Sequence, residues 1–431
     1  MSLLLSYYGD DFTGSTDVME ALAAYGLETV LFTRIPSHEE FAPFAGYAAL
    51  GVAGISRSQP PKWMDEHLPE VLEWLKSLGA RFCHYKVCST FDSSPTIGSI
   101  GRAIEIARRI FAQAAVPLVV GAPQLGRYTF AGHLFANYRG QSWRIDRHPV
   151  MSRHPVTPMD ESDLRLHLAK QTLQPVQLAS MKMTEPGIHL LDVFDMATQL
   201  EAGERLLGLP PEARPFLAGS SGVEYALVQA LIRGGEISGA ADFAELRPVE
   251  RCLVVSGSVS PTTERQIRFA TANGFTSIAA DPVRLAGPDG AEEKSRLVVQ
   301  AARELEQGRS PLIHTAMGAA SDEGGKLDRI ADGRRRLGQS LGQITAELVR
   351  RHRLGRLILA GGDSSSHALG ELDIHALTTR LPLKETPGSP LCLAHSTNLA
   401  YAGLELAMKG GQIGGDDYFV KLKGGLSRHG A

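Results

Sequence analysis

Three carboxylates and several hydroxyls lie close together near the start of the chain, in the run Gly9-Asp10-Asp11-Phe12-Thr13-Gly14-Ser15-Thr16-Asp17. Apolar residues precede this run and helix-forming residues follow it, which predicts a strand, a tight turn and the start of a helix. The N–H groups at a helix start attract anions and polar ligand oxygens. Asp10 and Asp11 are therefore candidates for a base, or for acceptors beside a bound ligand. The alternative is that one of them only caps the helix.

Further polar residues stand where two later strands are predicted to end. Arg57 follows a strand predicted at 48–55, and Lys86 lies near the end of one predicted at 82–87. Ligands of a parallel sheet bind beyond the carboxyl ends of its strands, so we expect one shared pocket. Arg57 would bind a carboxylate through two donors, and Lys86 would add positive charge. Groups suited to a polyol come next in the sequence: Ser89, Thr90 and Asp92.

Residues 127–160 differ from the units on either side of them. Residues 127–135 alternate like one antiparallel strand, and residues 147–156 contain two Arg-His-Pro-Val repeats that cannot form a helix. Long ordered loops are often functional. We therefore expect this excursion to lie beside the substrate, with three candidate ligands: His133, Arg153 and His154.

Two predicted strand ends in the second half of the chain suit a phosphate group. Ser256-Gly257-Ser258 offers hydroxyl and N–H groups after one strand, and Ser260 is suited to cap a helix that begins at Pro261. Gly361-Gly362-Asp363-Ser364 follows another strand, and glycines there allow the backbone to approach a phosphate closely. Asp363 would hold Mg²⁺ directly or through water.

A third glycine-rich loop, which contains Gly411 and Gly414, follows a strand predicted from residue 404. Neither a Walker lysine motif nor a Gly-x-Gly-x-x-Gly fingerprint occurs in the chain. The residues by themselves therefore leave the identity of a nucleotide open.

The elements that must position these residues alternate between strand and helix. Helices are predicted at 61–78 and 98–113, among strands at 28–32, 48–55, 82–87 and 116–120. This alternation predicts an α/β fold with helices on both faces of a parallel sheet. At 431 residues the chain is too long for one ordinary core, and its small polar stretch at 234–247 suits a linker. We predict two domains, 1–238 and 248–431, each a mainly parallel sheet with flanking helices, with the active site in the cleft between them.

The composition is that of an ordinary globular protein, with 43% hydrophobic residues and a net charge of -3. This charge leaves no basic surface for nucleic acid. No apolar run approaches the roughly 20 residues that span a bilayer, and no signal peptide is expected. The four scattered cysteines suit buried free thiols in a cytoplasmic protein. A homodimer is the default expectation for the assembly.

The run from Gly9 to Gly14, followed by Asp17, resembles the opening of the four-carbon acid sugar kinase family. Those two-domain enzymes phosphorylate short sugar acids with ATP. Residues 56–58 and 86–93 are similar to the segments that line the family's sugar-acid site. The Ser-Gly-Ser, Gly-Gly-Asp-Ser-Ser and Lys-x-Gly-x-x-Gly segments resemble its three ATP-binding segments. The resemblance implies ATP and Mg²⁺, with nucleotide contacts from Ser256, Ser258, Gly361, Gly362, Asp363, Ser364, Gly411 and Gly414.

The segment from Cys88 to Asp92 is like the 3-oxo-tetronate branch of that family, whereas residues 95–101 depart from its usual Gly-Asn-Ile-Gly pattern. A changed pocket wall is what a branched substrate such as 3-oxo-isoapionate would require. We therefore expect a kinase that phosphorylates the terminal hydroxyl of a short 3-oxo acid, with Asp10 or Asp11 as the base. The alternatives are a threonate or erythronate kinase, a non-enzymatic sugar-acid-binding protein, and a phosphatase or aldolase that uses Lys86.

Overall fold

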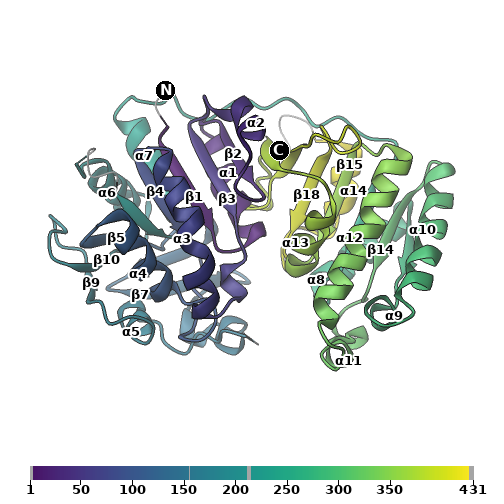
Figure 1. Cartoon of the computed structure of the whole chain (residues 1–431), viewed down its shortest axis with the longest axis horizontal. Coiled ribbons are helices and arrows are strands. Elements are labelled where there is room, and N and C mark those ends of the chain that lie inside the picture. Colours follow the sequence, from purple (N-terminus) through teal and green to yellow (C-terminus); the bar gives the residue numbers. More distant parts are fainter. Residues whose placement is uncertain (1–2, 155, 211–214, 427–431) are drawn as a thin grey trace. The chain divides into compact units, whose positions relative to one another are not determined.

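The computed structural model describes residues 3–154, 156–210 and 215–426, without the side chains of residues 363–367. The chain divides into two compact units, Met1–Asp242 and Phe243–Ala431. Each unit has a mainly parallel sheet with flanking helices, which confirms the predicted α/β class (Figure 1). Among the described residues, no helix has both the length and the apolar character needed to cross a bilayer.

In the first unit, the strands of the main sheet lie in the order β2-β3-β1-β4-β11-β5-β10-β9, and all neighbours are parallel. Their bounds are β1 Leu5–Gly9, β2 Thr29–Phe32, β3 Ala49–Ala53, β4 Phe82–Lys86, β5 Ala115–Val119, β9 Val176–Leu178, β10 Gly187–Leu191 and β11 Phe216–Gly219. The helices are α1 Phe12–Ala23, α2 His38–Phe41, α3 Pro61–Ser77, α4 Ile100–Phe111, α5 Leu164–Ala169, α6 Met196–Leu207 and α7 Gly222–Arg233.

The chain leaves β1 and β4 in opposite directions across this sheet. From β1 it crosses through α1 to β2 on one side, and from β4 it crosses through α4 to β5 on the other. A reversal between two neighbouring parallel strands opens a crevice at their carboxyl ends, where α/β proteins bind ligands. Asp10 follows β1 and Lys86 ends β4, so the topology brings these two predicted site residues together.

A small antiparallel sheet lies within the excursion after β5. It contains β6 Arg127–Phe130, β7 His133–Tyr138 and β8 Gln141–Arg144. The prediction of one strand over 127–135 is therefore wrong. Ala131 and Gly132 have φ values of 50° and 87°, and two consecutive residues in the left-handed region form the tight turn of a hairpin.

In the second unit, the strands lie in the order β13-β14-β12-β15-β18-β17-β16; the first five are parallel to one another, and β17 is antiparallel to both of its neighbours. Their bounds are β12 Leu253–Ser256, β13 Phe275–Ala279, β14 Ser310–His314, β15 Arg356–Ala360, β16 Ala376–Leu381, β17 Leu391–His395 and β18 Glu405–Lys409. The helices are α8 Pro261–Ala272, α9 Pro282–Ala286, α10 Gly290–Glu306, α11 Gly324–Leu327, α12 Gly333–His352, α13 Gly362–Glu371 and α14 Tyr418–Gly424.

The second unit has the same reversal between β12 and β15. The chain leaves β12 toward β13 and leaves β15 toward β16, on opposite sides. Ser256 ends β12 and Gly361 follows β15, so these two predicted phosphate segments are neighbours. As predicted, α8 begins at Pro261 and is capped by the Ser260 side chain, which accepts from the N–H of Thr262.

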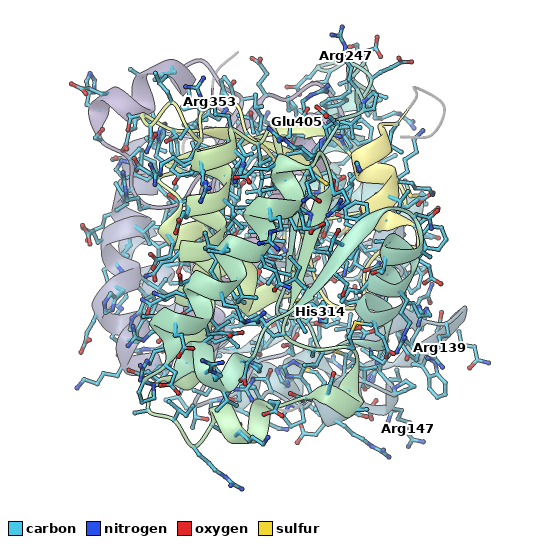
Figure 2. All side chains as sticks on the ribbon, turned by 90° about the vertical axis from the view of Figure 1, so that its right-hand side faces the viewer. Arg139, Arg147, Arg247, His314, Arg353 and Glu405 are labelled. Atoms are coloured by element: carbon cyan, nitrogen blue, oxygen red, sulfur yellow. The ribbon has the colours of Figure 1, made fainter. Side chains whose placement is uncertain are left out.

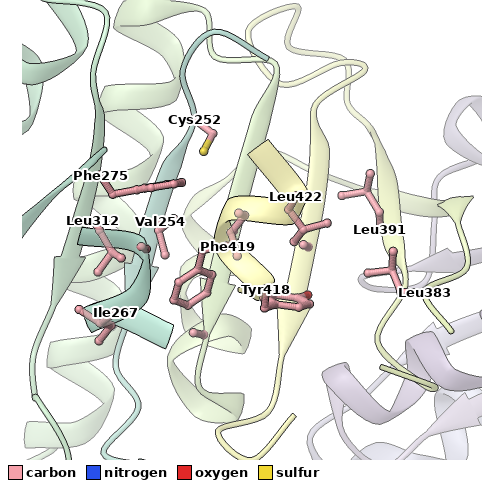
Figure 3. Close-up of a cluster of buried hydrophobic side chains, with 14 of the residues drawn as sticks. Cys252, Val254, Ile267, Phe275, Leu312, Leu383, Leu391, Tyr418, Phe419 and Leu422 are labelled. Carbon is pink, nitrogen blue, oxygen red and sulfur yellow. The ribbon is translucent and has the colours of Figure 1, made fainter. Parts of the chain in front are cut away.

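Buried contacts hold the second unit's strands against α14. Tyr418, Phe419 and Leu422 face apolar side chains of the sheet such as Val254 and Leu312 (Figure 3). At the amino end of β15, the buried Arg356 donates from Nε to Glu405 Oε2 at 2.8 Å (Glu405 is labelled in Figure 2). This pairing places β15 and β18 side by side, and both strands lead into predicted nucleotide loops.

The helix α7, which carries Glu224, packs closely against α6. This close packing depends on Gly203 in α6. A Cβ atom at this position would lie 1.9 Å from the carbonyl oxygen of Ala226. We expect Gly203→Ala to lower the free energy of unfolding by about 1–3 kcal/mol through overpacking, measured by urea denaturation. The matched change Gly370→Ala, which meets no atom within 4 Å, should be neutral or stabilising. Equal effects of the two changes would contradict the packing argument.

Candidate active site

The turn between β1 and α1 places Asp10 and Asp11 in different environments. Asp11 caps α1, because its Oδ1 accepts from the N–H of Gly14 at 2.7 Å. Asp10 is 4% exposed, its N–H donates to the carbonyl of Lys86 at 2.9 Å, and its carbonyl accepts from the N–H of Arg57 at 2.9 Å. The backbone of Asp10 thus connects the carboxyl ends of three strands, and the capping alternative applies to Asp11.

The carboxyl group of Asp10 is buried, and its pKa is raised. Its Oδ1 is buried and has no hydrogen-bond partner in the described part of the chain. Burial, followed by the negative charge of Asp11, raises the pKa of Asp10 to about 7, although Arg57 and Lys86 act in the opposite direction. A carboxyl group that titrates near neutral pH is suited to accept a proton from a substrate hydroxyl.

Arg57 is held between two carboxylates. Its Nη2 donates to Asp92 Oδ1 and Oδ2 at 2.9 and 2.8 Å, and its Nη1 donates to Asp11 Oδ2 at 3.2 Å. Asp92 also accepts from the hydroxyls of Thr90 and Thr157. Burial alone would raise the pKa of Asp92, but the charge of Arg57 and the hydrogen bonds from Thr90 and Arg57 hold it below its usual value. Arg57 therefore links Asp11 and Asp92, which follow two different strands, within the predicted pocket.

Lys86 is buried and pairs with Asp17, whose Oδ2 lies 3.6 Å from the lysine Nζ. Burial raises the pKa of Asp17 despite this neighbour. Two residues before Lys86 on β4, His84 Nδ1 and Glu224 Oε1 lie 2.6 Å apart, and both side chains are buried. Glu224 interacts electrostatically with Asp17, so a second buried polar pair lies near the first.

The other predicted substrate residues divide into two groups. His154 joins the cluster through Thr157, because its Nδ1 accepts from the Thr157 N–H at 3.1 Å and Thr157 Oγ1 donates to Asp92. Ser89 is half-buried beside Thr90. His133 instead pairs with Ser162, with 2.9 Å between Nδ1 and Oγ, and Arg153 is exposed; within the described residues neither forms a hydrogen bond or ion pair with the cluster.

Sequence reasoning missed two residues of this site. Thr157 reaches Asp92 from far along the chain. Arg127 follows Gly126 and begins β6, just after the turn beyond β5, and its guanidinium interacts electrostatically with Cys88. A basic residue next to a glycine at a strand's carboxyl end was the available signal for Arg127.

The three predicted nucleotide segments of the second unit meet around Ser258. Thr263 Oγ1 donates to Ser258 Oγ at 3.0 Å and to the carbonyl of Gly411 at 3.1 Å. A Cβ atom on Gly411 would lie 2.8 Å from Ser258 Oγ, and one on Gly361 would lie 3.2 Å from the N–H nitrogen of Ser258. Gly361 has a φ of 113°, which favours glycine. The backbone conformation at Gly361 thus favours glycine, and a side chain at Gly411 would have to displace the Ser258 hydroxyl.

The remaining predicted nucleotide residues border this cluster. Ser256 Oγ accepts from the N–H of Ser258 at 3.3 Å, and Gly414 packs against Tyr418. α13 begins at Gly362, so the partial positive charge of a helix start lies at this edge. The predictions for the side chains of Asp363 and Ser364 fall outside the described residues.

Lys409 ends β18 and is fully buried next to these loops. Its Nζ donates to Thr263 Oγ1 at 3.1 Å, and no carboxylate among the described residues pairs with it. Burial lowers the pKa of Lys409 to about 7. A buried cation without a counter-ion is costly, and a bound anion would offset that cost.

A pocket of about 630 Å³ lies at the carboxyl ends of β13 and β14. Thr315 lines it and donates its N–H to the carbonyl of Ser256 at 3.0 Å, so one residue of its lining lies beside the Ser256 segment. Asp281, Arg284 and Lys326 also line it. His314, labelled in Figure 2, ends β14 directly before Thr315.

Comparison with known proteins divides the chain in the same way. The sequence model of a family described as a sugar-binding N-terminal domain matches residues 5–227. A second, described as a nucleotide-binding C-terminal domain, matches residues 253–419. The first range contains the carboxylate cluster around Asp10, and the second contains the glycine-rich loops around Ser258.

Individual relatives cover nearly the whole chain. The 3-oxo-isoapionate kinase of Paraburkholderia graminis is 42% identical over 98% of this chain and 94% of its own length. The 3-oxo-tetronate kinase of Cupriavidus necator is 28% identical over 99% and 98% of the two chains. A crystal structure from Salmonella typhimurium LT2 shares the fold, with a TM-score of 0.75, 22% identity and coverage of 97% and 98%.

From the raised pKa of Asp10 we predict how the free energy of unfolding depends on pH. Because the folded state holds the Asp10 proton up to about pH 7, whereas an unfolded aspartate loses it near pH 3.8, this group stabilises the fold at low pH and less as pH rises through 7. Asp10→Asn should therefore increase the free energy of unfolding at pH 8, by on the order of 3 kcal/mol, and the gain should shrink toward pH 5. Urea denaturation across this range measures both. The exposed control Asp65→Asn should show no such trend, and a loss of stability in Asp10→Asn at pH 8 would contradict the assignment.

Proposed function

The chain belongs to the four-carbon acid sugar kinase family, and we propose that it transfers the γ-phosphoryl group of ATP to the terminal hydroxyl of 3-oxo-isoapionate. That it is a sugar-acid kinase follows from its relatives. The choice of acid is carried by one observation: the relative that uses 3-oxo-isoapionate is 42% identical, against 28% for a 3-oxo-tetronate kinase. The departure at residues 95–101 from the 3-oxo-tetronate pattern supports the same choice.

Asp10 is the proposed base. Its Oδ1 has no partner in the described structure, whereas the oxygens of Asp11 are engaged by Gly14 and Arg57. Its pKa of about 7 suits proton transfer from a hydroxyl at neutral pH. We propose that Asp11, through Arg57, positions this carboxylate rather than accepting the proton.

The proposed phosphate site is the cluster of Ser258, Gly361, Gly411 and Lys409. Backbone N–H groups and a glycine-rich approach suit the phosphate oxygens, and the buried charge of Lys409 lacks a protein anion among the described residues. The pocket lined by Thr315, which bonds to the backbone of Ser256, is large enough for the nucleoside half of ATP. Phosphoryl transfer depends mainly on such positioning and charge neutralisation.

Mg²⁺ is proposed to accompany ATP. The described residues contain no group of three His, Cys, Asp or Glu side chains that could hold a metal ion. Mg²⁺ is commonly held by substrate phosphates, water and only one or two carboxylates, so its binding does not need three protein side chains. Asp363 is the proposed protein ligand. Bound in this way, the ion would neutralise phosphate charge. The homodimer and the position of the active site between the domains stay predictions.

The assignment of the base is tested by two isosteric changes. Asp10→Asn should lower kcat by roughly 10²–10⁴-fold with little change in the affinity for ATP, because the proton acceptor is lost while the nucleotide site is intact. Asp11→Asn should cost less, through weaker positioning of Arg57. Steady-state kinetics and calorimetric titration with an ATP analogue give both quantities. If Asp11→Asn is the more damaging change, the two roles must be exchanged.

The substrate is tested by comparing kcat/KM on four acids: 3-oxo-isoapionate, 3-oxo-tetronate, threonate and erythronate. We expect 3-oxo-isoapionate to be used best and 3-oxo-tetronate within about 100-fold of it, since one extra carbon is discriminated only weakly. The two 3-hydroxy acids should be far poorer, because a site built to hydrogen-bond the oxo group loses that bond. Highest kcat/KM on threonate or erythronate would overturn the proposal.

A further inference from the structure

Three cations interact electrostatically with Cys88, which follows β4 at the carboxyl end of the first unit's sheet. Arg57, Lys86 and Arg127 each lie within electrostatic range of the Cys88 thiol. Arg57 lies in the turn after β3, Lys86 is the last residue of β4, and Arg127 is the first residue of β6, which follows β5. Cys88 is half-buried, so the space around it is partly open. Arg127 pairs with Ala122 directly beyond the carboxyl end of β5, so it lies at the same end of the sheet as the two predicted cations.

Two of the three cations are already neutralised by protein carboxylates. Arg57 is engaged by Asp92 through Nη2 and by Asp11 through Nη1. The Nζ atom of Lys86 lies 3.6 Å from Asp17 Oδ2, and both side chains are buried. A substrate carboxylate could bind either cation only by competing with these anions. Neither is therefore well suited to be the principal anchor of an acid.

Arg127 differs from them, because no carboxylate pairs with it in the described part of the chain. Its Nη1 donates to the carbonyls of Leu125 and Gly126, at 3.0 and 3.2 Å. Its Nε is buried and has no partner among the described residues. Nη2 likewise makes no hydrogen bond within them. The edge formed by Nε and Nη2 is one of the two edges through which a guanidinium binds a carboxylate with parallel hydrogen bonds.

The backbone around Arg127 is fixed in a way that holds this edge in place. Ala122 and Arg127 exchange both backbone hydrogen bonds, at 2.9 and 3.1 Å, directly beyond β5. Gly126 turns the chain with a φ of 63°. Because the carbonyls of Leu125 and Gly126 occupy Nη1, the guanidinium cannot rotate without losing those bonds. The free edge is thus preorganised, which lowers the entropic cost of binding an anion.

We propose that Arg127 binds the carboxylate of the sugar acid through its Nε and Nη2 atoms, and so selects acids over neutral sugars. This inference rests on the proposed function, because it names the part of the acid that the site recognises. Arg57 and Lys86 then shape the pocket and set the charge around Asp10, rather than holding the substrate's acid group. Burial by itself lowers the pKa of Arg127, so a bound carboxylate also relieves the cost of keeping this group charged.

The test compares Arg127→Gln with the wild type on the 3-oxo acid that the wild type uses best and on its carboxamide. Arg127→Gln should raise KM for the acid by about 10- to 100-fold, the effect of losing a hydrogen bond to a charged group. It should leave kcat and KM for ATP within about threefold, since the lost contact holds the substrate equally in the ground and transition states. KM for the carboxamide should hardly change, so the preference for the acid should largely disappear.

Two further variants separate binding from structural damage. Arg81→Gln is the matched control, because Arg81 is also half-buried and donates to a backbone carbonyl, that of Leu207. Arg81 precedes β4 and therefore lies at the amino ends of the strands, away from the site. It should leave both KM values unchanged. Arg127→Lys keeps the charge without the planar edge and should give an intermediate KM for the acid. It also stands in if Arg127→Gln does not fold.

The inference is overturned if KM for the acid stays at its wild-type value, or if the acid and the carboxamide are affected equally. Calorimetric titration of the acid without ATP gives the same comparison as a dissociation constant. If the wild type binds the acid through Arg127 but phosphorylates none of the acids, the proposed function fails while this inference stands.

Discussion

The direction in which the chain leaves neighbouring parallel strands decides where chemistry can occur in both units. β1 and β4 send the chain to opposite sides of the first sheet, and β12 and β15 do the same in the second. At each reversal no crossover covers the carboxyl ends of the two strands, so loops and helix starts remain open to a ligand. Both candidate sites lie at such a point. The strand order around it is the same in both units, since each first strand is flanked by its third and fourth.

The two sites have the same topology but opposite electrostatics. In the first unit, buried carboxylates and cations neutralise one another almost completely, as in the contacts of Arg57 with Asp92 and of Lys86 with Asp17. Among the described residues of this cluster, Asp10 and Arg127, one of each sign, form no ion pair. In the second unit, glycines and hydroxyls surround the buried Lys409. The first set suits a hydroxylated acid with a proton to lose, and the second suits a polyanion.

Because Asp10, Arg127 and Lys409 lie in partly or fully buried surroundings, their charges affect substrate binding. In water a lone carboxylate or ammonium is well solvated, but inside a protein each raises the free energy of the free enzyme unless it finds a partner. A substrate that brings the missing partner therefore binds more strongly than its contact area alone suggests. The same burial keeps the pKa of Asp10 near 7, so that this carboxyl group can exchange a proton at neutral pH.

Features that depend on neighbouring residues were readable from the sequence alone. The alternation of strands and helices, the helix start at Pro261 with its cap Ser260, and the polar residues at strand ends all follow from local patterns. The family resemblance also lies in short segments, and it correctly indicated a sugar-acid kinase. One local prediction was wrong, because Ala131 adopts a left-handed turn that residues other than glycine rarely enter.

Only the tertiary structure decided which charged side chains have a partner of opposite charge within the protein. Whether Arg57 would bind a ligand or Asp92, and whether Asp11 or Asp10 would cap α1, depends on distances across loops that follow different strands. The order of those strands is a property of the whole fold, and electrostatic energies fall steeply with distance and rise with burial. The importance of Arg127 and Lys409 likewise lies in the absence of a described carboxylate partner, and an absent contact leaves no mark in a sequence.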